Sequence, residues 1–193
     1  YFIIFFKLLK NFFVYILFFI LIKIFIKKKI NLKKYKNCFH SFEHSFQDNT
    51  DYNYIDRQYG IAPLKKNLRD NFYLISLTYK KKFFLNFSNK IKKLNNQKLD
   101  YFISDRYLKL NDIISVYLKS IFYLIKIILH SKRESFYINK KDCFNVLYPL
   151  LLSSFAGNIQ SFILQSLAIK NFFNYTESKN FINYGEFSPG YKS

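Results

Sequence analysis

The residues best suited to chemistry lie near the end of the chain, where Glu186 follows Gly185. A carboxylate at the end of a strand can act as a general base toward an acceptor hydroxyl, or it can hold that hydroxyl by hydrogen bonds. Gly185 and Gly190 would let the backbone approach a ligand closely, and Ser188 completes this set. The alternatives are a structural Glu186 paired with a lysine and a plain turn at the glycines. We predict Glu186 as catalytic and the other three residues as substrate-binding.

A short buried strand must position Glu186. Residues 181–184 are mostly apolar or aromatic, which suits a strand, and residues 188–190 (Ser-Pro-Gly) are typical of a turn. In open α/β sheets, ligands bind beyond the carboxyl ends of the strands, so the site is expected there. The chain begins with Tyr1 and stops seven residues after Glu186 without a closing element. We therefore expect it to be a piece of a longer protein.

Two further groups of polar residues are candidates for substrate binding. Ser154 and Gly157 belong to a run of small residues before an apolar segment, predicted as a loop at a helix N-terminus. Such a terminus offers free N–H groups to a phosphate, although a simple helix N-cap has the same composition. Asp56 and Arg57 precede a Gln-Tyr-Gly sequence. They either contact a ligand or pair with each other to order the loop.

No metal or cofactor is predicted. Cys38, His40 and His44 have suitable ligand types, but no fourth ligand is evident, and we expect both histidines at the surface. Cys143 is isolated, and two unpaired cysteines fit a reducing compartment. The sequence contains no GxGxxG, GxxxxGK[ST], HExxH or GxSxG motif, so these enzyme classes receive little support.

Composition argues for a folded domain and against nucleic acid as the partner. Half of the 193 residues are hydrophobic, and Phe and Tyr dominate. The net charge of +19 would suit nucleic acid or an anionic membrane, but it comes from 27 lysines and only 4 arginines. Nucleic-acid sites favour arginine for its bidentate geometry. The abundance of Lys, Asn, Ile, Phe and Tyr is also the signature of a genome of low G+C content.

Residues 1–36 are predicted as a hydrophobic helix followed by a basic segment. Residues 2–26 are strongly apolar, yet the longest uninterrupted apolar run is eleven residues, Phe12 to Ile22. Lys23 could snorkel toward Lys27–Lys29, which would mark a cytoplasmic membrane end. A helix on the membrane surface and a helix packed on a protein core remain alternatives.

Residues 37–193 are predicted as an incomplete α/β domain, because helices and strands alternate along it. We expect strands at 72–78 and 101–103, and helices at 63–70 and 159–173. A further helix at 112–130 should be buried on most sides, because its polar stripe is narrow. Another at 142–152 should end or bend at Pro149. Residues 37–60 are expected to be a loop, 79–99 a loop with a helical turn, and 131–141 a charged linker.

The order of three motifs resembles a known family. These are Asp56-Arg57-Gln58-Tyr59-Gly60, the small-residue stretch from Ser153 to Gly157, and a strand ending in Gly185-Glu186-Phe187. Together they resemble the glycosyltransferase-like proteins of bacterial capsule and O-antigen clusters, over roughly residues 40–193. The turn of that family usually reads Glu-Phe-Gln or Glu-Asn-Gln, whereas Ser188 follows Phe187 here.

The resemblance implies the N-terminal part of a two-domain enzyme with a Rossmann-like, GT-B-type fold. It implies transfer of a sugar from a nucleotide-sugar donor to a glycan or lipid-linked acceptor, in the cytoplasm at the inner membrane surface. The second, nucleotide-binding domain would lie outside this sequence. The alternatives are a membrane-anchored structural or interaction protein without catalysis, and a basic nucleic-acid binder.

Overall fold

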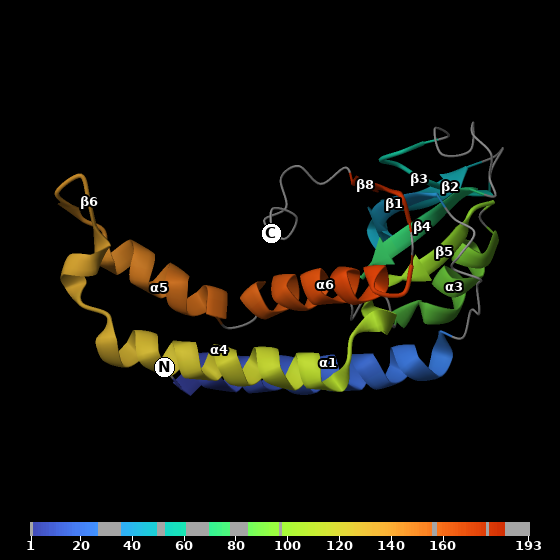
Figure 1. Ribbon diagram of the computed structural model, residues 1–193. Coiled ribbons are helices and arrows are strands. Elements are labelled where there is room, and N and C mark those ends of the chain that lie inside the picture. Colours follow the sequence, from blue (N-terminus) through green and yellow to red (C-terminus); the bar gives the residue numbers. More distant parts are fainter. Residues whose placement is uncertain are drawn as a thin grey trace. The chain divides into compact units, whose positions relative to one another are not determined.

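The computed structural model describes residues 2–26, 36–49, 53–60, 70–77, 85–96, 98–155, 158–176 and 178–183 (Figure 1). The chain forms two compact units, each discontinuous in sequence. Unit 1 comprises Tyr1–Leu21 and Leu108–Leu167, and unit 2 comprises Ile22–Tyr107 and Ala168–Ser193. Unit 2 contains a parallel sheet, and unit 1 is mainly helical.

Unit 2 is built around four parallel strands. They are β1 (Asn37–Phe42), β4 (Asn71–Ser76), β5 (Asp100–Ile103) and β8 (Asn180–Asn183). Their spatial order is β5-β4-β1-β8, and each neighbouring pair is parallel. The carboxyl ends of all four strands therefore lie at one edge of the sheet. The expected α/β class is confirmed, as are the strands predicted at 72–78, at 101–103 and after Lys179. The expected burial of the last strand is wrong, because Phe181 and Ile182 of β8 are exposed.

Smaller elements surround the sheet in unit 2. The short 3-10 helix η2 (Glu43–Ser45) follows β1, and an antiparallel hairpin of β2 (Phe46–Asn49) and β3 (Asn53–Asp56) comes next. Helix α3 (Phe87–Asn96) precedes β5, and a second 3-10 helix, η5 (Ser104–Tyr107), follows it.

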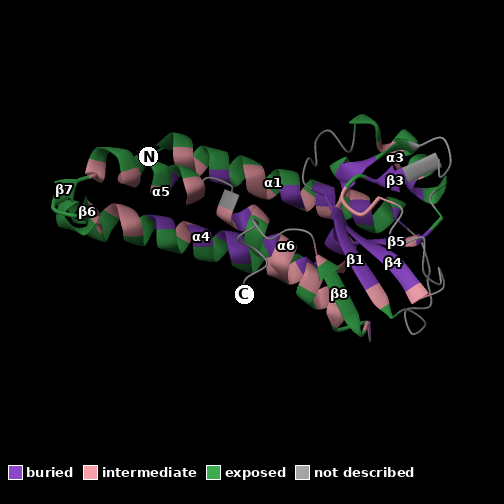
Figure 2. Cartoon of the chain, turned by 90° about the horizontal axis from the view of Figure 1, so that it is seen from above, coloured by how far each residue is buried: buried purple, intermediate pink, exposed green. Residues whose placement is uncertain are grey.

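The core of unit 2 lies on both faces of β4, all six residues of which are buried (Figure 2). Because side chains alternate along a strand, Phe72 and Leu74 share one face. They form a cluster with Cys38 of β1, Phe102 of β5 and Phe172 near the end of helix α6 (Asn158–Phe173). The ring centroids of Phe72 and Phe102 are 5.3 Å apart, and those of Phe102 and Phe172 are 5.5 Å apart. Aromatic packing thus fixes α6 on this face.

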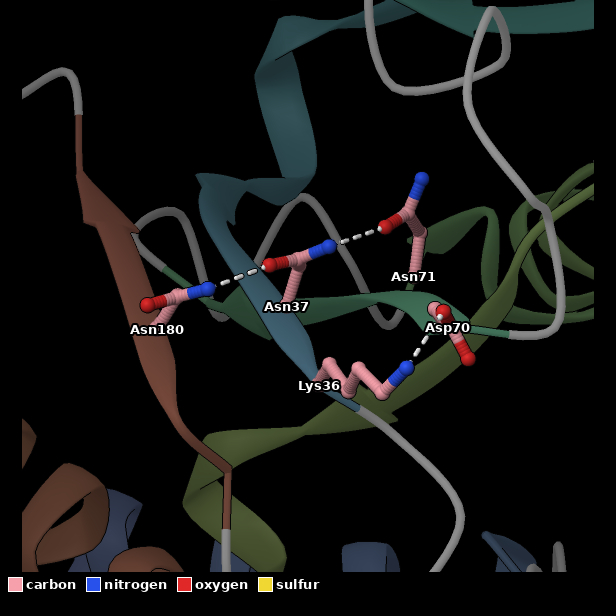
Figure 3. A network of polar contacts seen from close by, with 5 residues as sticks. All are labelled: Lys36, Asn37, Asp70, Asn71 and Asn180. Carbon is pink, nitrogen blue, oxygen red and sulfur yellow. Dashed lines mark hydrogen bonds and ion pairs between the residues drawn. The ribbon is translucent and has the colours of Figure 1, made fainter.

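The amino-terminal edge of the sheet is tied by side-chain amides (Figure 3). Asn37 donates from Nδ2 to Oδ1 of Asn71 at 2.8 Å, and Asn180 donates in the same way to Asn37 at 2.8 Å. These three residues occupy one register row of β8, β1 and β4. Next to them, Lys36 forms an exposed ion pair with Asp70 at 3.3 Å.

Unit 1 is formed by long apolar helices. Its elements are α1 (Phe2–Phe25) up to Leu21, α4 (Leu110–His130), α5 (Phe144–Phe155) and α6 up to Leu167. The 3-10 helix η6 (Arg133–Phe136) and a hairpin of β6 (Tyr137–Ile138) and β7 (Lys141–Asp142) connect α4 with α5. The two turn residues of this hairpin, Asn139 and Lys140, have positive φ, as a tight two-residue turn requires.

Aromatic contacts hold the helices of unit 1 together. The ring of Tyr117 on α4 lies 5.2 Å from that of Phe12 and 6.0 Å from that of Tyr15 on α1. The hydroxyl of Tyr15 donates to Oγ of Ser161 on α6 at 2.9 Å. Both α1 and α4 are long and apolar enough to cross a membrane, with mean hydropathy of 2.2 and 1.7. The predicted N-terminal apolar helix is therefore confirmed.

Several expectations about local structure are wrong. Residues 37–60 are not mainly loop, because β1, β2 and β3 lie within them. Residues 79–99 contain the ten-residue helix α3 rather than a single helical turn. The expected linker at 131–141 contains η6 and β6. Helix α5 does not end at Pro149, since it continues to Phe155 at the cost of one backbone hydrogen bond. The helix predicted at 63–70 lies almost entirely outside the described residues.

Helix α4 is also less buried than its narrow polar stripe predicted. Leu118, Phe122 and Leu129 are 62%, 65% and 71% exposed. Within this chain α4 therefore presents a broad apolar face that no described residue covers. Periodicity identifies an apolar helix correctly, but it does not distinguish burial in protein from exposure to a hydrocarbon medium.

Candidate functional site

A row of hydrogen-bonded polar side chains crosses the carboxyl edge of the sheet. His40 of β1 contacts Oδ1 of Asn183 on β8 through Nδ1 at 3.3 Å, and Oγ of Ser76 on β4 through Nε2 at 2.8 Å. Ser76 in turn lies 2.8 Å from Oγ of Ser104, which follows β5. All four strands thus contribute to one network, and we call these four residues together with Asp105 the polar row.

The register of the strands explains why the polar row forms. Phe42 of β1 pairs with Ser76 of β4, and His40 of β1 pairs with Asn183 of β8. The strands therefore end at different positions along the same edge of the sheet. His40 and Ser76 have the same side-chain direction as Cys38 and Phe72, because residues two or four positions apart point to one face of the sheet. The polar row therefore continues the face that carries the aromatic core.

Asp105 closes the row at its β5 end. Its Oδ2 accepts the backbone N–H of Leu77, just after β4, at 3.1 Å, and it lies 3.4 Å from the hydroxyl of Ser104. Ser104 also lies within 3.3 Å of the carbonyl oxygen of Ile75. Asp105 thereby joins the segment after β5 to the segment after β4.

All members of the polar row except Asn183, which is half-buried, are withdrawn from water. His40 is 1% exposed, Ser76 and Ser104 are both 0% exposed, and Asp105 is buried. Burial lowers the pKa of His40 to about 4, against the opposing effect of its hydrogen bond with Asn183. His40 is therefore neutral near pH 7. In the Nδ1–H tautomer its Nδ1 donates to Asn183 and its Nε2 accepts from Ser76.

Ser76, His40 and Asn183 follow the order of a hydroxyl, a base and an orienting group, which is the arrangement of hydrolytic nucleophiles. A Ser76 hydroxyl without exposed surface cannot reach a substrate in this arrangement. The chemical role of the row is therefore to position the strand ends and the residues that follow them. A fully hydrogen-bonded buried network is well suited to this, because any displacement leaves a polar group without its partner.

A second set of contacts lies on the other face of the same edge, around Asp56. The hydroxyl of Ser41 donates to Oδ2 of Asp56, and the N–H of Gln58 donates to its Oδ1 at 2.6 Å. Burial raises the pKa of Asp56, while these hydrogen bonds and that of the Tyr59 N–H oppose the shift. The carbonyl oxygen of Asp56 also accepts the N–H of Gly60 at 2.8 Å. Asp56 thus organises the turn from residue 57 to residue 60.

That turn directs Tyr59 across the boundary between β1 and β8. The Tyr59 hydroxyl lies 2.7 Å from the carbonyl oxygen of His40 and 3.0 Å from that of Ile182. Its ring also packs on Phe39 of β1, with centroids 5.3 Å apart. A hydroxyl has a single hydrogen to donate, so the two carbonyl groups share it. Tyr59 therefore holds the ends of β1 and β8 together.

A buried carboxylate follows β1 directly. Glu43 in η2 is 4% exposed and forms an ion pair with Lys90 of α3. Burial lowers the pKa of Lys90. The second oxygen of Glu43, Oε2, is buried and has no hydrogen-bond partner among the described residues. This oxygen could accept one further hydrogen bond without displacing Lys90.

Of the residues predicted from the sequence to bind substrate, Asp56 lies at this edge of the sheet. Arg57 is exposed and donates from Nε to Oε1 of Gln47 at 2.7 Å. The expected ion pair between Asp56 and Arg57 is absent, although the structure describes both residues. Asp56 orders the loop through Ser41 and backbone amides instead.

The prediction of a loop at Ser154 is wrong. Ser154 lies in the last turn of α5, in unit 1, and its hydroxyl donates to the carbonyl oxygen of Leu150 at 2.9 Å. It therefore satisfies a backbone group of its own helix. Gly157 and the terminal set of Gly185, Glu186, Ser188 and Gly190 lie outside the described residues. Asn183, the last described residue of β8, stands three positions before Glu186 in the sequence.

Sequence reasoning missed the polar row. His40 was expected at the surface, and this is wrong, because its partners come from strands 36 and 143 positions away. One signal was present: Ser104 and Asp105 directly follow a predicted strand, where ligand-binding residues gather in α/β sheets. Among the described residues, no three His, Cys, Asp or Glu side chains come together as metal ligands.

Comparisons of the chain with protein-family models, with curated proteins and with solved structures find no significant match. Function must therefore be inferred from the sequence motifs and from the geometry of the carboxyl edge.

Proposed function

We propose that the chain is the N-terminal, Rossmann-like part of a GT-B-type glycosyltransferase of bacterial surface polysaccharide biosynthesis. The observation that carries this proposal is the strand order β5-β4-β1-β8 in an all-parallel sheet. Counted along the chain, the parallel strands lie in the order third, second, first, fourth. This is the order of a doubly wound sheet around its switch point, which falls between β1 and β8. Ligands of such sheets bind at that point, beyond the carboxyl ends of the strands.

The described side chains at this edge do not favour a pyrophosphate there. The polar row is buried and would position the ligand-binding segments rather than contact the ligand, and the Lys90 ammonium is engaged by Glu43. A pyrophosphate favours cations and helix N-termini, whereas a sugar acceptor requires neither. This part of the enzyme would therefore bind the acceptor, and the nucleotide-sugar donor would bind mainly to a second domain.

In the proposed reaction, Glu186 acts as the general base. Its carboxylate takes the proton of the acceptor hydroxyl while the acceptor oxygen bonds to the anomeric carbon of the donor sugar. The bond from that carbon to the phosphate oxygen breaks, and the nucleoside diphosphate leaves. Gly185, Ser188 and Gly190 would line the path of the acceptor. The polar row and Tyr59 would position the end of β8, which precedes all four residues in sequence.

The test is nucleotide release by the protein produced from its complete gene. Nucleotide sugars are supplied together with a membrane extract as the source of acceptor, and nucleoside diphosphate is measured. Glu186→Gln should reduce the rate by about 10²-fold or more, because a general base contributes on that scale. Glu134→Gln, which alters an exposed residue of η6, is the matched control and should leave the rate unchanged. Absence of release by the natural protein, or an unchanged rate for Glu186→Gln, would contradict the proposal.

A second candidate function is a membrane-anchored structural or interaction protein without catalysis. It is favoured by α1 and α4, whose most apolar windows are only 22% and 28% buried within the chain. In either case we propose a cytoplasmic protein anchored in, or peripheral to, the inner membrane. Carbonate extraction distinguishes these attachments, since spanning helices keep the protein in the membrane pellet. Release into the supernatant would rule out spanning by α1 or α4.

A further inference from the structure

Exposed residues of α1 within unit 1 form an apolar stripe along the helix. They recur every three or four positions, which is the spacing that places residues on one face: Phe2, Phe6, Leu9, Phe13, Leu17 and Ile20. At the rise of an α-helix, this stripe is about 27 Å long. The opposite side of α1 is packed, since Leu8 and Tyr15 are buried and Tyr15 contacts Ser161 of α6. The stripe therefore points away from α6.

Helix α4 carries a second exposed apolar stripe, with the same spacing: Ile114, Leu118, Phe122, Ile125 and Leu129. A polar stripe follows another side of this helix: Asp112, Ser115, Lys119, Tyr123, Lys126 and His130. Its first four members line the cavity between α4 and the helices α5 and α6, so the polar stripe borders those helices. The buried residues Val116, Ser120 and Leu124 lie on the side of α4 opposite to the apolar stripe.

The two apolar stripes lie on the same side of unit 1. Helices α1 and α4 run side by side, with the rings of Phe12 and Tyr117 5.2 Å apart, and α5 and α6 lie on one side of this pair (Figure 1). Both stripes belong to the side that α5 and α6 leave open. We call the two stripes together the apolar face of unit 1.

The charged side chains of α1 and α4 indicate a phospholipid bilayer as the partner of the apolar face. Within unit 1, α1 carries Lys7 and Lys10 and no acidic residue, and the only acidic residue of α4 is Asp112. The Asp112 carboxylate is engaged, because its Oδ2 accepts the N–H of Lys109 at 2.9 Å. Lysines beside an apolar helix face can extend their ammonium groups to lipid phosphates, and this pattern is typical of helices that bind a membrane surface.

The same charges decide how the helices are oriented in the bilayer. Lys119 lies at the middle of α4, so a spanning α4 would place its ammonium group near the bilayer midplane, where a charge is costly. If α4 lies parallel to the membrane, its whole polar stripe stays on the water side. The apolar stripe then enters the acyl region by about 5–10 Å, as in other interfacial helices.

We propose that the apolar face of unit 1 lies in one leaflet of a phospholipid bilayer, with α1 and α4 parallel to the membrane plane. Unit 1 is then a monotopic membrane-binding module, although both helices are long and apolar enough to span. This placement specifies the membrane attachment proposed above and does not depend on glycosyl transfer, which is measured separately as nucleotide release.

The depth of the α1 stripe tests this placement. The chain contains no tryptophan, so one introduced indole reports on one position. The full 193-residue chain with Phe6→Trp, Phe13→Trp or Ile20→Trp is reconstituted into vesicles of phosphatidylcholine and phosphatidylglycerol, brominated near either the headgroup or the terminal methyl group. We expect equal quenching at the three positions, stronger with bromine near the headgroup. A maximum at position 13 with bromine near the terminal methyl group would indicate a spanning helix and overturn the proposal.

Leu118→Trp and Lys119→Trp form a matched pair, since the two residues are neighbours on α4 and both are exposed. Iodide is present on both sides of the vesicles, and circular dichroism confirms that each variant is helical. We expect iodide to quench position 119 and this quenching to be lost at position 118, with bromine giving the reverse order. Protection of both positions from iodide would overturn the proposal in favour of a spanning α4. Absence of bromine quenching at positions 13 and 118 would overturn it in favour of a protein contact on the apolar face.

Discussion

At its amino-terminal edge the sheet of unit 2 is tied by the side-chain amides of Asn37, Asn71 and Asn180, with an exposed ion pair beside them. At its carboxyl edge the same strands are tied by His40, Ser76 and the other members of the polar row. The first network does not titrate and is partly open to water. The second contains an imidazole and a carboxylate, and all of its members except Asn183 are buried.

The difference shows that burying polar groups costs more free energy at the carboxyl edge of the sheet than at the amino-terminal edge. Of the three amides at the strand starts only Asn71 is fully buried, so this network stabilises the register at a smaller desolvation cost. Burying an imidazole requires that every hydrogen bond be kept, because an unpaired polar group in a low-dielectric interior is costly. Such an arrangement is expected where strand ends must be held in place for ligand binding, and the carboxyl edge is where ligands of α/β sheets bind.

The largest expected effect comes from removing the imidazole at the carboxyl edge. His40→Ala should lower the free energy of unfolding by about 3–5 kcal/mol, because it leaves a cavity and takes the partner from Ser76 and Asn183. Denaturant unfolding measures this loss. His44→Ala, at an exposed residue of η2, is the control and should change stability by less than about 0.5 kcal/mol. Equal losses of stability for the two substitutions would mean that the polar row contributes no more to the free energy of unfolding than an exposed residue does.

The second effect is a dependence of stability on pH that only the carboxyl edge should show. The pKa of His40 is about 4 in the folded protein against 6.5 ordinarily, so the unfolded chain binds a proton first as the pH falls. Stability should therefore be complete above about pH 6.5 and should decline between pH 6.5 and 4, by about 3 kcal/mol in total.

Unfolding free energies measured across this range test the dependence. His40→Gln should remove most of the slope, and His44→Gln should remove a smaller part of it, because burial also lowers the pKa of His44. If the natural protein and His40→Gln have parallel profiles, the slope belongs to other groups, and the contrast between the two edges would lose its electrostatic basis.

The smallest effects are expected at the amino-terminal edge. Asn37→Ala breaks both amide contacts, one of them to the buried Asn71, and should cost about 1–2 kcal/mol. Lys36→Ala removes only the exposed ion pair with Asp70 and should cost less than about 1 kcal/mol. Thermal or chemical unfolding of both variants checks this order. A loss for Asn37→Ala as large as that for His40→Ala would remove the distinction between the edges.

The sequence predicted the parts of the fold that depend on unbroken apolar runs. Strand β4 and helices α1, α4 and α6 were expected close to their observed bounds, since local composition is enough for them. Strand β1 was not, because Asn37, His40 and Ser41 interrupt its pattern. Those polar residues are tolerated in the sheet only because other strands supply their partners, and such pairings cannot be recognised from the local sequence.

The candidate site could likewise be predicted only where the local sequence carries the signal. The prediction that ligands gather at the carboxyl ends of strands led to the segment after β8, and Asp56 was selected from the motif that it begins. Neither line of reasoning gave a reason to expect His40 there. Ser154 was misassigned because small residues suit a loop and the last turn of a helix equally well. The role of Glu186 stays a prediction, because it lies outside the described residues.

The position of β8 also bears on how the protein folds and opens. Its contacts with β1 join residues 143 positions apart, so their formation must close the longest loop within the sheet. Contacts of such high sequence separation form slowly, and β8 is a short, exposed edge strand of four residues. We expect β8 to dock last during folding and to detach first during native-state fluctuations. In hydrogen-exchange measurements the amides of β8 should then exchange well before those of β4. The contact of Tyr59 with the end of β8 should determine how often β8 detaches.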